Sequence, residues 1–184
     1  MTEADSCGNP AASAWVARFV PLIAPRDRVL DLACGSGRHA RLLAGLGHAV
    51  VAADRSSDAL AALAGVAGIE PVQADLEQGA WPFAGLRFAG IVVTNYLHRP
   101  LLPRIAAALD EGGVLIYETF MQGNERFGRP SNPEFLLRPG ELLEAFAGLQ
   151  AVAFEQGEVA RPRPAALQRL CAVRGRQLAT LPSS

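Results

Sequence analysis

Short apolar runs alternate with amphipathic stretches along the chain, and this alternation predicts strands and helices in turn. The β-prone runs predict strands over residues 28–32, 48–53, 69–73, 88–94, 113–118, 149–157 and 166–173. Helical spacing and capping residues predict helices near 11–20 and over 38–46, 58–64, 100–109 and 139–146. Strands that alternate with helices predict a parallel sheet with right-handed crossovers, with a ligand outside the carboxyl ends of the strands.

Two connections stand out because one is long and the other is rich in proline. Residues 119–138 are rich in Gly, Asn, Pro and Arg, and a loop of this length is typically functional or disordered. The Arg-Pro-Arg-Pro run at 161–164 is expected to join the last two strands as a hairpin. We predict a single domain over residues 11–175, with a disordered leader over 1–10 and a frayed tail over 176–184.

The composition of the 184 residues is that of an ordinary globular protein, with 50% hydrophobic and 19% charged residues. The formal net charge of -1 predicts no general attraction to nucleic acid or to membranes. No apolar run reaches the roughly 18 residues of a membrane span, and the acidic start of the chain lacks the order of a signal peptide. We expect a cytoplasmic protein with no membrane partner, either a monomer or a homodimer.

Two features of the composition narrow the chemistry. All 17 basic residues are arginine, which excludes a pyridoxal-phosphate Schiff base and a phosphate-loop lysine. Cys7, Cys34 and Cys171 are odd in number and widely spaced, so we expect neither a disulfide framework nor a metal site.

The segment from Val29 to Ala40 is the most informative motif of the chain. An apolar run ends in the small residues Ala-Cys-Gly-Ser-Gly, and helix-prone residues follow from Arg38. A strand, a glycine turn and a helix in this order expose backbone N–H groups where the polar part of a nucleotide-like cofactor can bind. The run from Gly35 fits the pattern G-x-G-x-x-G/A, which dinucleotide enzymes share.

Two acids, Asp31 and Asp75, favour a methyl donor over a nicotinamide cofactor, and a third, Asp54, suits the ribose of either class. Asp31 lies before the turn, where it would repel a pyrophosphate but can attract a methionyl ammonium, directly or through water. Asp54 ends the next strand and suits ribose hydroxyls, although a helix-capping acid is the alternative. Asp75 follows the third strand and can accept a hydrogen bond from an adenine amine; a solvated loop acid is the alternative.

On these residues the chain resembles the class I S-adenosylmethionine-dependent methyltransferases, over about residues 12–174. The run from Asp31 to Gly37 follows the family pattern acid-x-G-x-G-x-G, with Ala33 at the first glycine position. The Gly-Ser-Gly-Arg-His-Ala run also resembles a small-molecule and tellurite-resistance branch of the family. The resemblance implies an α/β, three-layer, doubly wound Rossmann-like fold, with a mostly parallel seven-stranded sheet and a C-terminal antiparallel hairpin.

The same resemblance implies the cofactor S-adenosylmethionine, without a metal, and a set of residues to bind it. The turn would pack against the methionyl and ribose portion, Asp54 would hold the ribose hydroxyls, and Asp75 with Leu76 would hold the adenine. Asn95 would line the methyl-donor side. The full set expected to bind the cofactor is Asp31, Ala33, Cys34, Gly35, Gly37, Arg38, His39, Asp54, Arg55, Ser56, Asp75, Leu76 and Asn95.

Candidate catalytic residues follow the fourth and fifth strands. Tyr96 and His98 can act as a base or position the acceptor; a core aromatic and a capping or surface histidine are the alternatives. Glu118 can bind a cationic acceptor or act as a base, and an ion pair with a loop arginine is the alternative. The residues after Asn95 lack the Pro-Pro-aromatic continuation of methyltransferases that act on exocyclic amines of bases or on glutamine.

Arginines are the candidate ligands for the acceptor. Arg99, Arg126 and Arg129 are expected to bind it, with the 119–138 loop as a lid; a solvated loop is the alternative. Further arginines crowd the terminal hairpin and can dock RNA, although a solvated face is favoured. These are Arg161, Arg163, Arg169, Arg174 and Arg176.

The sequence therefore predicts a methyltransferase that acts on a small-molecule acceptor. An RNA or protein methyltransferase of the same fold, an NAD-dependent oxidoreductase and a binding module without catalysis remain as alternatives.

Overall fold

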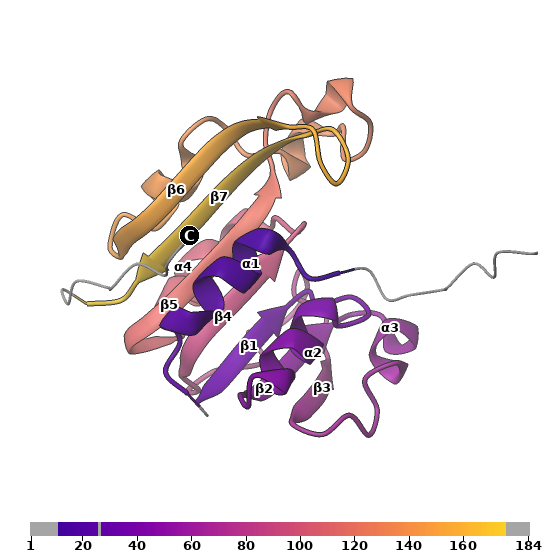
Figure 1. Cartoon of the computed structure of the whole chain (residues 1–184), viewed down its shortest axis with the longest axis vertical. Coiled ribbons are helices and arrows are strands. Elements are labelled where there is room, and N and C mark those ends of the chain that lie inside the picture. The colour runs from indigo at the N-terminus through magenta and orange to yellow at the C-terminus, as the bar shows by residue number, and fades with distance from the viewer. Residues whose placement is uncertain (1–10, 26, 176–184) are drawn as a thin grey trace, which may run out of the picture.

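The computed structural model, which describes residues 11–25 and 27–175, has a seven-stranded sheet between two layers of helices (Figure 1). The strand order is β3-β2-β1-β4-β5-β7-β6. Strands β1 to β5 are parallel, whereas β7 runs antiparallel to both β5 and β6. The strands are β1 (Arg28–Leu32), β2 (Ala49–Asp54), β3 (Ile69–Gln73), β4 (Phe88–Thr94), β5 (Leu109–Phe120), β6 (Gln150–Val159) and β7 (Ala165–Val173). The three-layer fold, its mostly parallel sheet and its antiparallel hairpin are as predicted.

Helices cover both faces of the sheet. On one face lie α1 (Ala14–Phe19), α2 (Arg38–Gly45) and α3 (Ser57–Ala61), and on the other lie α4 (Leu102–Ala107) and α5 (Glu141–Ala145). Single 3-10 turns complete the connections as η1 (Val20–Leu22), η2 (Arg99–Leu101), η3 (Asn124–Arg126) and η4 (Pro133–Phe135).

Alternate side chains of each strand face opposite helix layers, because successive residues of a strand point to opposite sides of a sheet. In β1, Leu30 and Leu32 join the core under α4 and α5, whereas Val29 joins the core under α2. Asp31 has the same parity as Val29, so this acid is directed into an apolar core at the start of α2. That placement makes Asp31 the unusual residue of the strand.

Three expected strands, β1, β3 and β4, have the expected bounds, three others differ by one or two residues at an end, and β5 differs most. It begins at Leu109, four residues before the expected start, because Leu109 already pairs with Phe88 of β4. The register then shifts between the Phe88–Leu109 and Gly90–Val114 pairs, and Gly112, which has a positive φ, lies within this irregularity. The expected leader and tail lie outside the described residues.

The long loop after β5 is fixed to the sheet at several points. The Gln122 N–H donates to the Leu137 carbonyl at 2.9 Å, and the Leu137 N–H donates to the Phe120 carbonyl at 3.0 Å. Asn124 is 2% exposed; its Nδ2 donates to the Pro130 carbonyl, and its Oδ1 accepts from the N–H of Ala166 in β7. The loop is therefore held against the carboxyl ends of the strands. Its role as a lid stays a prediction.

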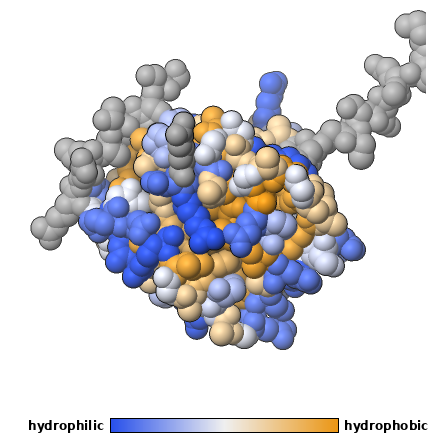
Figure 2. All heavy atoms as spheres, turned by 90° about the horizontal axis from the view of Figure 1, so that it is seen from below, coloured by the Kyte–Doolittle hydropathy of each residue, from blue (hydrophilic) through white to orange (hydrophobic). Residues whose placement is uncertain are grey.

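The surface seen from below in Figure 1 mixes hydrophilic and hydrophobic residues (Figure 2). Large side chains that remain exposed are dispersed in the sequence: Leu46, Leu86, Phe127, Phe135 and Leu143. Single exposed apolar residues are normal on proteins. Only Phe135, among these five, lines the cavity described next.

Candidate active site

The turn after β1 is held by backbone contacts to β2 and by close packing. The Cys34 N–H donates to the Ala53 carbonyl at 3.0 Å, and the Gly37 N–H donates to the Cys34 carbonyl at 3.0 Å. Gly37 has a φ of 78°, and a Cβ there would lie 2.4 Å from the Leu63 side chain. Glycine is therefore required at 37 both for its left-handed backbone and for the close approach of α2 to Leu63.

Asp54 connects this turn to the end of β2. One oxygen of its carboxylate accepts the Gly35 N–H at 2.8 Å, and the other accepts the Ser56 N–H at 2.9 Å. Two backbone donors thus fix the orientation of a carboxylate that is still partly open to solvent. Each oxygen keeps a second lone pair, with which it can accept a hydrogen bond from a ligand.

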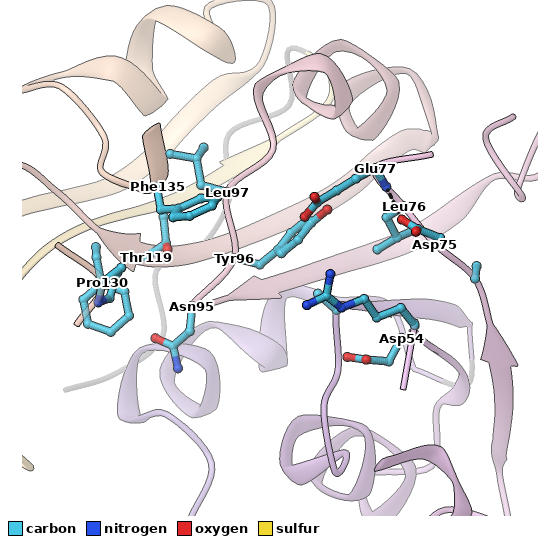
Figure 3. Close-up of a pocket in the computed structure, with 14 residues that line it drawn as sticks. Asp54, Asp75, Leu76, Glu77, Asn95, Tyr96, Leu97, Thr119, Pro130 and Phe135 are labelled. Carbon is cyan, nitrogen blue, oxygen red and sulfur yellow. Dashed lines mark hydrogen bonds between the residues drawn. The ribbon is translucent and has the colours of Figure 1, made fainter. Parts of the chain in front are cut away.

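A cavity of about 370 Å³ lies at the carboxyl ends of the parallel strands. Figure 3 shows Asp54, Asp75, Leu76 and Glu77 at one end of it, with Thr119, Pro130 and Phe135 at the other and Asn95 and Tyr96 between them. Of the expected cofactor ligands, six line the cavity: Ala33, Asp54, Arg55, Asp75, Leu76 and Asn95. The structure therefore brings the ends of β1, β2, β3 and β4 together around one space, in the position predicted from the strand order.

Strained backbone marks two of the lining residues. Ala33 has a φ of 55° and Asn95 a φ of 54°, which is the left-handed region that residues other than glycine rarely adopt. Such a conformation costs on the order of 1 kcal/mol or more per residue. Both residues follow directly on adjacent strands, so the strain is concentrated where the chain bends around the cavity.

Asp31 is buried beside this cavity but does not line it. The side chain is 1% exposed, and its Oδ2 has no hydrogen-bond partner among the described residues. Burial raises the pKa of Asp31 to about 7, against the opposing effects of the Ala40 backbone N–H and of Arg38. A buried acid with an unused oxygen fits a site that receives a cation, directly or through water.

Tyr96 lies between the two ends of the cavity, with its ring directed toward Glu77 (Figure 3). Its buried hydroxyl has no partner within the described part of the chain. Burial, together with the charges of Glu77 and Asp75, raises the pKa of Tyr96. A phenol that resists ionisation is a weak general base, whereas its free O–H can donate to a bound ligand.

Neither His98 nor Glu118, the other candidate catalytic residues, lines the cavity. Glu118 is 6% exposed and accepts a hydrogen bond from Arg169 at 2.6 Å. These two residues face each other across β5 and β7, and Arg169 also lies over the Trp15 ring. The ion pair that the sequence left as an alternative is therefore present, with a strand arginine in place of a loop arginine.

Two of the three expected acceptor ligands are occupied elsewhere. Arg99 makes a two-pronged contact to Glu141, at 2.6 and 3.0 Å, and donates to the carbonyls of Glu134 and Leu136. Arg126 pairs with Glu158 of β6. Neither lines the cavity, and both instead hold the loop and the hairpin in place.

The remaining expected cofactor ligands do not line the cavity, and three of them, Cys34, Gly35 and Gly37, form the turn itself. His39 is 1% exposed; its Nε2 accepts the Ser13 N–H at 3.1 Å, and its Nδ1 lies 3.3 Å from the Thr94 hydroxyl. Burial lowers the pKa of His39 to about 4, and burial also raises the pKa of the Cys34 thiol. The members of the expected set that do not line the cavity are Asp31, Cys34, Gly35, Gly37, Arg38, His39 and Ser56.

Sequence reasoning missed much of the far wall. Thr119 and Phe120 continue β5 beyond the expected strand end, and Pro130 and Phe135 come from the long loop. Because loop side chains have no periodicity, no pattern in the sequence indicates which of them face inward. Thr119 was accessible to prediction, since it follows an expected strand end by one residue.

Residues 29–113 match the family model described as "Methyltransferase domain", a range that runs from β1 into β5. Similar solved structures include TehB from Haemophilus influenzae, with a TM-score of 0.76 and 19% identity over 91% of this chain and 64% of that one. A TehB-like SAM-dependent methyltransferase from Corynebacterium glutamicum has a TM-score of 0.63 and 21% identity, with 88% of each chain covered. The N-methyltransferase NodS from Bradyrhizobium japonicum has a TM-score of 0.66 and 16% identity, with 87% of this chain and 94% of that one covered. A comparison with curated proteins finds no match.

The fold is that of the class I methyltransferases. The matched domain and the similar structures confirm the resemblance to the S-adenosylmethionine-dependent class, whose cofactor is S-adenosylmethionine. The chain spans 64% of the length of the TehB structure. No described helix is both long and apolar enough to cross a membrane. Within residues 11–25 and 27–175, no group of three His, Cys, Asp or Glu side chains could hold a metal ion.

Proposed function

We propose that this protein transfers the methyl group of S-adenosylmethionine to a small-molecule acceptor. The observation that carries the proposal is Asp54, held by the Gly35 and Ser56 N–H groups at the edge of the cavity. This arrangement joins the glycine turn to an acid that suits ribose hydroxyls. The unpartnered oxygens of Asp31 and Tyr96 supply an acceptor for a cation and a donor for a polar edge of the cofactor.

Different residues of the chain would bind different parts of the cofactor. Asp54 would accept hydrogen bonds from the ribose, Asp75 would accept one from the adenine amine, and Asp31 would offset the charge of the methionyl ammonium. When bound, S-adenosylmethionine supplies a methyl group whose bond to sulfur breaks, leaving the electron pair on sulfur, as a bond forms to the acceptor atom. Thr119, Phe120 and Phe135 would align the acceptor and exclude water, which are the main demands of an in-line displacement.

Calorimetry with S-adenosylhomocysteine tests the proposed cofactor site. We expect the wild type to bind and Asp54→Ala to bind less tightly, by about 1–3 kcal/mol for a lost buried hydrogen-bond partner. Asp58→Ala is the matched control, because this exposed acid lies four residues further on, in α3, and does not line the cavity. Absence of binding to the wild type, or stronger thermal stabilisation by NAD than by S-adenosylhomocysteine, would contradict the proposal.

The acceptor is addressed by a second experiment with the full chain. Transfer of a labelled methyl group to fractions of a cell extract should label a small molecule. Label that appears instead in RNA or in protein would reject the small-molecule part of the proposal and leave the cofactor site intact.

A further inference from the structure

The far end of the cavity adjoins a second hollow of about 560 Å³, which we term the annex. The two spaces share four lining residues, Asn95, Phe120, Pro130 and Phe135, so a molecule in the annex can reach the methyl-donor side. The annex adds two cations, Arg129 from the loop after β5 and Arg163 from the turn between β6 and β7.

The guanidinium groups of these two arginines have no acidic partner among the described residues. Among the described residues, neither Arg129 nor Arg163 forms an ion pair or donates a side-chain hydrogen bond. Three other arginines of the long loop and of β7, by contrast, are paired with a glutamate: Arg126 with Glu158, Arg138 with Glu144 and Arg169 with Glu118. The Arg163 guanidinium lies 6.0 Å from the centroid of the Phe120 ring, which keeps the cation at the annex wall.

The charges along the combined space are unevenly distributed, with three acids and the single cation Arg55 among the described residues that line the first cavity. Asp54, Asp75 and Glu77 lie at the donor end, whereas none of the described residues that line the annex is acidic. The acids favour hydrogen-bond donors and cations of a ligand, such as hydroxyl, amine and ammonium groups. The arginines of the annex favour an anionic group. Phe120 and Phe135 line both spaces, and Phe135 is 50% exposed, so an apolar surface is available next to the cations.

We infer that the annex binds an acceptor that carries an anionic group, a carboxylate or a phosphate, on an apolar or aromatic body. Arg129 and Arg163 would hold the anion, since the guanidinium fork matches the geometry of both groups. The Phe120 and Phe135 rings would contact the body and direct the reacting atom toward Asn95. This inference rests on the proposed function, because it assigns the acceptor class of that site.

Binding of benzoate and of its neutral analogue benzamide, measured by NMR titration of the full chain saturated with S-adenosylhomocysteine, tests the inference. We expect benzoate to bind at least tenfold more tightly than benzamide. The double variant Arg129→Gln/Arg163→Gln should lose this preference and bind S-adenosylhomocysteine as the wild type does. Arg161→Gln is the matched control, because it removes the same charge two residues from Arg163, at a position that does not line the annex.

Equal binding of benzoate and benzamide, or an equal loss of preference in Arg161→Gln, would overturn the inference. So would an RNA oligonucleotide that binds more tightly than benzoate and depends equally on Arg161, since the arginines would then form a nucleic-acid surface. If S-adenosylhomocysteine itself does not bind the wild type, the proposed function fails. If it binds and no anion preference is found, only the acceptor class is wrong.

Discussion

At the scale of single residues, Asp31 carries the sharpest conflict between folding and binding. It is an acid in the middle of an apolar core, with one oxygen unpartnered, beside Arg38 and in the field of Asp54. An isosteric neutral side chain would relieve the cost of burial and remove the charge that a bound ammonium requires. Stability and cofactor affinity are therefore expected to respond in opposite directions to the same substitution.

We predict that Asp31→Asn stabilises the ligand-free protein at pH 8 and weakens its binding of S-adenosylhomocysteine. The pKa of Asp31 in the folded protein is raised to about 7, from 3.8 in a model peptide. Below pH 4 the acid is protonated in both states, and as the pH rises toward 7 the unfolded chain loses its proton first, so stability is lost. The gain in Asp31→Asn should thus appear between pH 4 and 7, with an upper limit of about 4 kcal/mol.

Urea unfolding at pH 4 and pH 8, together with calorimetry at pH 8, provides the measurement. A variant that is no more stable than the wild type at pH 8 would show that burial does not raise the pKa of Asp31. If the variant binds S-adenosylhomocysteine with undiminished affinity, Asp31 does not contribute to the cofactor site.

At the scale of elements, the loop after β5 is positioned by η2 and α5. Arg99 of η2 contacts Glu141 at the start of α5 and two carbonyls of the intervening loop. Burial alone would raise the pKa of Glu141, but the hydrogen bonds from Arg99 and from the Arg138 backbone leave it below its ordinary value. An arginine that sequence reasoning placed in the acceptor site thus shapes the wall of that site from behind.

Arg99→Gln is expected to destabilise the protein by about 2–3 kcal/mol at pH 7, because it leaves the buried Glu141 without its main cation. The value lies toward the low end for a buried pair, since the Arg99 side chain is 39% exposed. Because the folded-state pKa of Glu141 is lowered, this contribution is present above pH 4.5 and is lost as the pH falls through that lowered pKa. Chemical unfolding at pH 7 and below pH 4 measures both effects.

Arg138→Gln is the control for this pair. Arg138 lies 3.5 Å from the same carboxylate but is 60% exposed, so its loss should cost less than about 1 kcal/mol. Equal losses in the two variants would show that Arg99 does not hold the loop.

At the scale of the whole molecule, the sheet divides the two tasks of the proposed enzyme. Strands β1 to β4 surround the donor end, whereas β5, the long loop and the β6–β7 turn provide the acceptor end. A ligand that binds only the folded state protects the segments whose opening would disrupt its site.

Hydrogen exchange should reveal this division directly. With S-adenosylhomocysteine, exchange should slow at residues 33–37, 54–57, 74–77 and 94–97, while the edge strand β6 exchanges as in the free protein. Uniform slowing that includes β6 would indicate global stabilisation, and protection confined to β6 would place the ligand elsewhere.

The sequence predicts the donor end better than the acceptor end, for a physical reason. Strands β1 to β4 are short, apolar and locally encoded, and parallel strands bring their carboxyl ends to one edge, so Asp54, Asp75 and Asn95 could be placed without coordinates. The interactions of Glu118 and Arg99 are made with partners that lie 51 and 42 residues away in the sequence. No local pattern reports such pairings, because each depends on the register of β7 or on the path of the loop.

The end of the matched methyltransferase domain lies close to the boundary between the proposed donor and acceptor ends. The match ends at residue 113, and every described annex residue except Asn95 lies beyond it. The matched range therefore covers the proposed donor end, while most of the proposed acceptor site lies outside it. An engineer who wished to redirect this protein would exchange the segment 119–164 as one cassette and leave the glycine turn untouched.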